Sequence, residues 1–214
     1  MLTVESVSGQ NQKDLSVVER NRMSEQKTLL VFAHSDEASA FADVPHIVSG
    51  VGKVNASVAL AGALAEGGVE RVIVLGTAGV VGNADEDRPS LDTIYQVTRL
   101  IQHDFPLASN DVVPTGEILL PDTQATMATG DVFVSNDEQR THISGLNAQL
   151  VDMEGYAYAS MCQRFDVPLQ IFKVPSDYAD SSTSMEDWDA IVIAKSVQLR
   201  EFYDAHLSSA PPVS

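Results

Sequence analysis

The sequence predicts an α/β fold with three layers, a central sheet between two layers of helices. Short apolar runs, typical of strands buried on both faces, alternate with segments of helical periodicity. Strands separated by helices favour a mixed but mostly parallel sheet. The chain has 214 residues and 44% hydrophobic content, which suits one such domain with a full core.

Three strands and one helix are expected in the first part of this pattern. The runs TLLVFA at 28–33, HIVSG at 46–50 and VIVLG at 72–76 predict buried strands. A helix is predicted over 54–66 because a glycine pair follows it, as is common at helix ends. Its inward face is expected to carry Val58, Ala61, Leu64 and Ala65.

The same alternation continues to the carboxyl terminus. Strands are expected over 93–101, 128–134 and 169–174, and a helix is expected over 153–164. A last helix is predicted to begin at Ser184, where a Ser-x-x-Asp spacing favours a helix start. Its inward residues are expected to be Trp188, Val192, Leu199 and Phe202.

Composition separates the first residues from the remainder. Residues 1–26 are rich in Ser, Gln, Asn and Glu without a sustained period, which indicates a flexible extension. No internal repeat or linker divides residues 27–214, so we expect them to form one domain.

Charge and cysteine content exclude several functions. The net charge is −17, which disfavours nucleic acid and membrane surfaces as partners. Cys162 is the single cysteine, so no intramolecular disulfide is possible, and a buried structural thiol is the simplest interpretation. No histidine spacing is typical of a metal site, and we expect no metal. Without a signal peptide or an apolar span in the sequence, we expect a cytoplasmic protein.

Two acids follow predicted strands and open the functional argument. Glu154 in VDMEGYAYA (151–159) lies at a helix start, and Asp177 in FKVPSDYAD (172–180) ends a strand. Carboxyls on separate elements suit chemistry that protonates a leaving group while holding a polar substrate. Asp152, just before Glu154, is interpreted as a helix cap.

Three further motifs follow strands, and the first two also have a purely structural alternative. Glu37 in AHSDEASAF (33–41) is either a functional acid or an ordinary acid in the first turn of a helix. The turn SGVGK (49–53) is either a ligand-binding glycine loop or a tight strand-to-helix connection. In LGTAG (75–79), Thr77 and its neighbouring amides are suited to hold water, phosphate or a ribose hydroxyl.

These motifs, in this order, resemble the nucleoside phosphorylase and nucleosidase superfamily. The resemblance covers 28–207 in short blocks, among them ATGDVFVSND at 128–137, and is greatest to the methylthioadenosine/S-adenosylhomocysteine nucleosidases. It implies a phosphorylase/hydrolase-like fold and an active site without a cofactor. The implied catalytic residues are Asp177, Glu37 and Lys173. The implied substrate-binding residues are Glu154, Met153, Phe133, Val134, Thr77, Ala78, Gly79 and Ser176.

In this resemblance Asp177, oriented by Ser176, assists departure of a purine base, and Glu37 polarises the attacking water. An aspartate does this at neutral pH only if its pKa is raised or if the proton is shared with the base. Met153 and Glu154 would lie against the sugar, and Phe133 would stack on the base, although Phe133 taken alone is more typical of a core aromatic.

Three departures limit the resemblance. The segment between the first two predicted strands is short, so a hairpin of the family is missing. Lys173 stands where the nucleosidases usually carry arginine. Residues 105–122 lack the aromatic, glycine-rich loop with which a partner subunit covers the 5′ end of the substrate, so the 5′ group stays open.

We therefore expect a homodimeric hydrolase that cleaves the N-glycosidic bond of a purine nucleoside into free base and ribose sugar. The alternatives are a phosphate-dependent phosphorylase and a non-catalytic nucleoside-binding protein. Val74 and Leu75 precede Gly76 where phosphorylases place an arginine, which favours water as the nucleophile.

Overall fold

A seven-stranded sheet organises the molecule, in the order β2-β1-β3-β6-β5-β4-β7. The computed structural model describes residues 27–82, 88–107, 110–181 and 185–208, and the predicted extension at 1–26 lies outside them. The strands are β1 (Thr28–Phe32), β2 (Ile47–Val48), β3 (Arg71–Val80), β4 (Tyr95–Gln102), β5 (Gln124–Thr129), β6 (Leu150–Asp152) and β7 (Leu169–Asp177). The helices are η1 (Ser39–Phe41), α2 (Lys53–Ala65), α3 (Asp137–Ser144), α4 (Gly155–Phe165) and α5 (Met185–His206).

The sheet closes on itself through its longest strand. β3 pairs in parallel with β1 and β7 and in antiparallel fashion with β6, so β3, β6, β5, β4 and β7 form a ring. A register shift between Ala78 and Gly79 re-aims the end of β3 at the point where β6 and β7 meet it. The α/β class and the mixed, mostly parallel sheet are thus confirmed. The expectation of a three-layer sandwich did not include this closure, and the layering stays a prediction.

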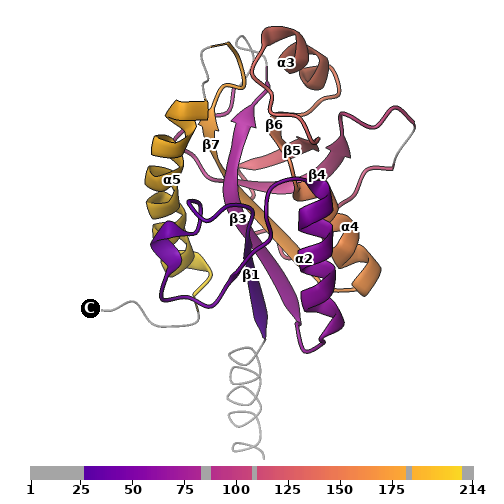
Figure 1. Cartoon of the computed structure of the whole chain (residues 1–214), viewed down its shortest axis with the longest axis vertical. Coiled ribbons are helices and arrows are strands. Elements are labelled where there is room, and N and C mark those ends of the chain that lie inside the picture. The colour runs from indigo at the N-terminus through magenta and orange to yellow at the C-terminus, as the bar shows by residue number, and fades with distance from the viewer. Residues whose placement is uncertain (1–26, 83–87, 108–109, 182–184, 209–214) are drawn as a thin grey trace, which may run out of the picture.

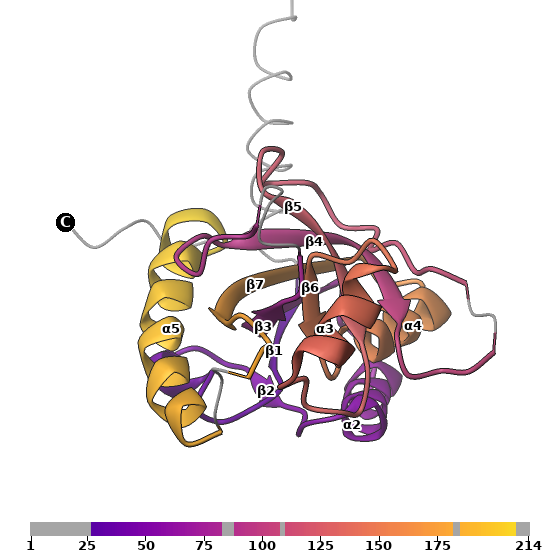
Figure 2. The same ribbon diagram turned by 90° about the horizontal axis from the view of Figure 1, so that it is seen from above.

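Helices pack on two sides of the strands (Figures 1 and 2). α2 and α4 contact each other on one side, whereas α5 packs against β7 and η1 on the other. On the α5 side, the ring centroids of Phe32 and Phe41 are 4.8 Å apart, and those of Phe172 and Phe202 are 4.9 Å apart. Aromatic pairs at these distances add to the free energy gained from burial. No helix in the described ranges has the length and apolar character needed to span a bilayer.

Several sequence expectations need correction. The strand expected over 128–134 ends at Thr129, and the residues after it form a loop. Asp36 and Glu37 lie in turns before η1 and do not open an α-helix. α2 turns a different face inward, because Val58 is 69% exposed while the buried residues are Ala56, Leu60 and Leu64.

Two elements were not predicted. β6 has only three residues, too few to show a period, and α3 (DEQRTHIS) has no apolar stripe. α3 is defined instead by its cap, where the Asn136 side chain accepts a hydrogen bond from Gln139 N at 2.9 Å. In α5, Val192, Leu199 and Phe202 are buried as expected, whereas Ser184 and the Trp188 side chain lie outside the described part.

Candidate active site

A cavity of about 330 Å³ opens where the carboxyl ends of several strands meet. Its walls come from the segments that follow β1 and β5 and from the ends of β3, β6 and β7. This is the edge at which ligands bind in open α/β sheets. The lining residues used below are Glu37, Val51, Thr77, Ala78, Gly79, Val132, Phe133, Val134, Met153, Glu154, Ser176 and Asp177.

Glu37 is a buried carboxylate held by four donors. Its Oε2 accepts from Ala33 N and His34 N at 3.2 Å each. Its Oε1 accepts from Thr77 N at 2.6 Å and from Thr77 Oγ1 at 2.8 Å. Donors from the turn after β1 and from β3 therefore fix this side chain from both sides, and the turn after β1 places Glu37 beside β3.

α5 holds the backbone of the loop that carries Glu37. Ser196 Oγ donates to the backbone oxygen of Glu37 at 2.7 Å and accepts from Ala40 N at 3.0 Å. Ser196 is fully buried, so these bonds are sheltered from water. A side chain far away in the sequence thus holds the loop that carries Glu37.

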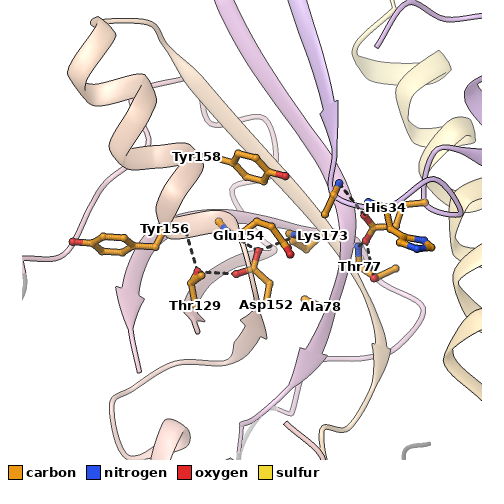
Figure 3. A network of polar contacts seen from close by, with 12 residues as sticks. His34, Thr77, Ala78, Thr129, Asp152, Glu154, Tyr156, Tyr158 and Lys173 are labelled. Carbon is orange, nitrogen blue, oxygen red and sulfur yellow. Dashed lines mark hydrogen bonds and ion pairs between the residues drawn. The ribbon is translucent and has the colours of Figure 1, made fainter. Parts of the chain in front are cut away.

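Glu154 occupies the N-cap position of α4, where Figure 3 shows it near Lys173 and Asp152. Gly52, whose φ of 93° suits glycine, donates its N–H to Glu154 Oε1 at 2.8 Å. Only 4% of Glu154 is exposed. Burial, followed by the negative charge of Asp152, raises the pKa of Glu154 to about 8, although Lys173 and the bond from Gly52 act against that rise.

Asp177 ends β7 with both carboxylate oxygens oriented. Ser176 Oγ donates to Oδ2 at 2.6 Å, and Ala179 N donates to Oδ1 at 2.7 Å. Ala179 adopts a φ of 49°, and the bond from its N–H to Asp177 closes this tight turn. The turn aims the carboxyl at the cavity that Ser176, Asp177 and Ala179 line together.

Asp152 lines the cavity and connects three neighbouring elements (Figure 3). Lys173 Nζ lies 3.2 Å from Asp152 Oδ2, which also accepts from Gly155 N at 2.9 Å. Thr129 Oγ1 donates to Asp152 Oδ1 at 2.7 Å and accepts from Tyr156 N at 2.9 Å. Lys173 is 1% exposed, and its neighbours Asp152, Glu37 and Glu154 raise its pKa against the effect of burial. The ion pair is therefore buried, and both oxygens of Asp152 accept hydrogen bonds.

The remaining wall of the cavity is apolar. Phe133 and Val134 come from the loop after β5, and Met153 lies beside Glu154. Val51 and Val132 also line the cavity while 40% and 44% exposed, which places them near its mouth. Such a wall suits a flat, partly apolar ligand.

The structure brings together every site residue implied by the sequence except Lys173, which is buried beside the cavity without lining it. Asp152 does accept from Gly155 N in the first turn of α4, as expected of a cap, but Glu154 holds the N-cap position and Asp152 also pairs with Lys173. Sequence reasoning missed this pairing and the role of Ser196, because nothing local in the sequence signals contacts between such distant positions.

Two further kinds of site, a metal centre and a reactive thiol, were considered for the described residues. Across the described residues, no group of three or more His, Cys, Asp or Glu side chains is placed to hold a metal ion. Burial raises the pKa of Cys162 to about 12, which agrees with a structural thiol.

Comparison with known proteins gives concordant results. Residues 120–202 match the model of the phosphorylase superfamily. An aminodeoxyfutalosine nucleosidase of Helicobacter pylori (strain ATCC 700392 / 26695) is 28% identical over 174 residues, which are 70% of this chain and 73% of that protein. A 5′-methylthioadenosine/S-adenosylhomocysteine nucleosidase of Shewanella denitrificans is 27% identical over 176 residues, which are 71% of this chain and 75% of that protein.

The fold has solved counterparts as well. The structure of a futalosine hydrolase of Helicobacter pylori strain 26695 superposes with a TM-score of 0.71 and 22% identity, covering 84% of this chain and 96% of the other. At this identity the likeness concerns the fold. The resemblance predicted from the motifs is confirmed: residues 120–202 match the phosphorylase superfamily model, and the similar proteins named here are nucleosidases.

Proposed function

We propose that this protein hydrolyses the N-glycosidic bond of a purine nucleoside, releasing free base and ribose sugar. The observation that carries the proposal is the convergence of Glu37, Glu154 and Asp177 on one cavity. Three acids on separate elements match the tasks of activating water, holding the sugar and assisting the leaving base. The nucleosidase relatives support the same reaction.

Departure of the base is assigned to Asp177. Ser176 orients this carboxyl, so that a proton on it faces a purine lying against Phe133 and Val134. Protonation of the base draws electrons from the glycosidic bond, and the ribose becomes oxocarbenium-like. Glu154 and Met153 hold the sugar, and water oriented by Glu37 and Thr77 attacks the anomeric carbon. Interactions that strengthen as charge develops are those that raise the rate.

Hydrolysis is favoured over phosphorolysis because the groups suited to bind phosphate are already in use. Thr77 N donates to Glu37, and Gly52 N donates to Glu154. Lys53 Nζ lies 2.6 Å from Asp104 Oδ1, and Lys173 is paired with Asp152. A phosphate dianion in this cavity would meet carboxylates instead of free cations, which is costly in a buried site.

Base release from a panel of nucleosides tests the proposal. The panel contains adenosine, inosine, methylthioadenosine, S-adenosylhomocysteine and aminodeoxyfutalosine, and Asp177→Asn serves as the inactive control. We expect wild-type protein to release base from at least one member. Binding of a nucleoside without release of base from any of them would contradict the proposal and favour a non-catalytic binding protein.

We also propose that the protein is a homodimer whose interface includes α2. Val54 and Val58 are 72% and 69% exposed and lie one helical turn apart, next to Val51 at the mouth of the cavity. Exposed apolar stripes of this kind mark contact surfaces. Sedimentation at micromolar concentration should give a dimer for wild-type protein and a monomer for Val54→Glu/Val58→Glu, and a wild-type monomer would contradict the proposal.

A further inference from the structure

Glu154 faces charges of both signs within one buried cluster. Asp152 on β6 and Lys173 on β7 lie beside it, Glu37 lies across the cavity, Tyr158 follows it on α4, and the N–H of Gly52 binds it from α2. The cluster holds three carboxyls, those of Asp152, Glu154 and Glu37, but only one ammonium, that of Lys173. Burial penalises the negative charge that remains when all four groups are ionised, and this favours a proton on one of the carboxyls. Which carboxyl does so depends on how each is bound.

Asp152 is the carboxyl best secured in its charged form. It accepts from Thr129 Oγ1 and Gly155 N and pairs with Lys173, so it has charge-assisted partners on both oxygens. Within the described part of the chain, Glu154 accepts one hydrogen bond, from Gly52 N. Of the two carboxyls, Glu154 is therefore the one whose protonation state depends on the neighbouring charges.

We propose that the buried Asp152–Lys173 ion pair holds two opposite charges beside Glu154 and thereby controls whether the Glu154 carboxyl is charged. The negative charge of Asp152 acts against ionisation of Glu154 and the positive charge of Lys173 favours it, and the 3.2 Å ion pair fixes the positions of both charges. This inference rests on the proposed function for its consequence: an ionised Glu154 grips the ribose hydroxyls more strongly than a neutral one. The pair then sets the acid limb of activity.

Carbon-13 NMR of the glutamate carboxyls measures this directly, without turnover. The Glu154 signal is assigned by its loss in Glu154→Gln. Asp152→Asn should move the pKa of Glu154 down and Lys173→Met should move it up, each by about 1 or more. Lys173→Arg keeps the charge and serves as the matched control, with a smaller change than Lys173→Met.

General damage to the fold would not shift the pKa of Glu154 in opposite directions in Asp152→Asn and Lys173→Met. Equal signs, or no change in either variant, would overturn the proposal. If Lys173→Met does not fold, the isosteric Asp152→Asn decides alone, because a rise or no change there contradicts the inference. In active protein the acid limb of kcat/KM should move with the NMR value. If wild-type protein has no activity, the proposed function fails while the NMR result still decides the control of Glu154.

Discussion

At the scale of single residues, the site depends on carboxyls whose partners come from distant parts of the chain. The sequence could indicate Glu37, Glu154 and Asp177, since each follows a strand that ends at one edge of the sheet. It could not indicate which donors bind them. The hydrogen bond from Thr129 to Asp152 and the ion pair of Asp152 with Lys173 form only when β5, β6 and β7 are brought together.

Asp177→Asn should lower kcat by roughly 10²–10⁴-fold, the usual range for loss of a general acid. The amide preserves shape and accepts from Ser176 or Ala179 but cannot deliver a proton. Steady-state kinetics and a thermal melt should show inactive, folded protein. Activity within about threefold of wild type would remove Asp177 from the mechanism.

Glu154→Gln should reduce kcat/KM for ribosides more than for 2′-deoxyribosides. A carboxylate binds sugar hydroxyls through charge-assisted bonds that an amide weakens. Kinetics on matched riboside and deoxyriboside substrates measures the difference. An equal loss on both sugars would sink the assignment of Glu154 to the ribose.

The same residue predicts a pH dependence of stability. Folding raises the pKa of Glu154 to about 8, so the folded state binds more protons and this group costs stability as pH rises from about 4.5 to 8. Glu154→Gln removes that cost. Its Tm relative to wild type should therefore be higher at pH 9 than at pH 5, and thermal melts at the two values that show no such change would contradict the burial argument.

At the scale of elements, loops and helix ends carry the chemistry while strands fix their positions. The strong apolar runs placed β1, β3 and β7 correctly, because burial on both faces leaves a clear signal in the sequence. β6 is too short for such a signal. The apolar run 132–134 after β5 looks like a strand in the sequence, but it is a loop that lines the cavity and packs only Val134 into a buried core cluster.

Ser196→Ala tests whether α5 helps to hold the loop after β1. Loss of two buried hydrogen bonds should destabilise the protein by about 1–3 kcal/mol. Because Ser196 bonds the backbone of Glu37, kcat should fall more than KM rises. Ser160→Ala on α4, which breaks only the bond to Tyr156 O, is the control. Equal kinetic effects from the two variants would show that α5 does not support the acid.

At the scale of the whole molecule, closure of the sheet through β3 and β7 places the ends of β1, β3, β5, β6 and β7 around one cavity. Alternation of strands and helices predicted the α/β class, but not this closure, because pairing between distant strands leaves no local pattern. The acidic composition has a local counterpart, since the amides of Gly52 before α2 and of Thr77 in β3 both donate to the protein's own carboxylates. In the proposed function, this feature favours water over phosphate as the nucleophile.

The most direct test of this account identifies the sugar product with and without phosphate. Wild-type protein is incubated with its best nucleoside substrate in phosphate-free buffer, and base and sugar are quantified before and after phosphate is added. The account predicts equimolar base and free ribose sugar, at a rate that phosphate does not increase. Turnover that begins only when phosphate is present, with ribose 1-phosphate as the product, would contradict it.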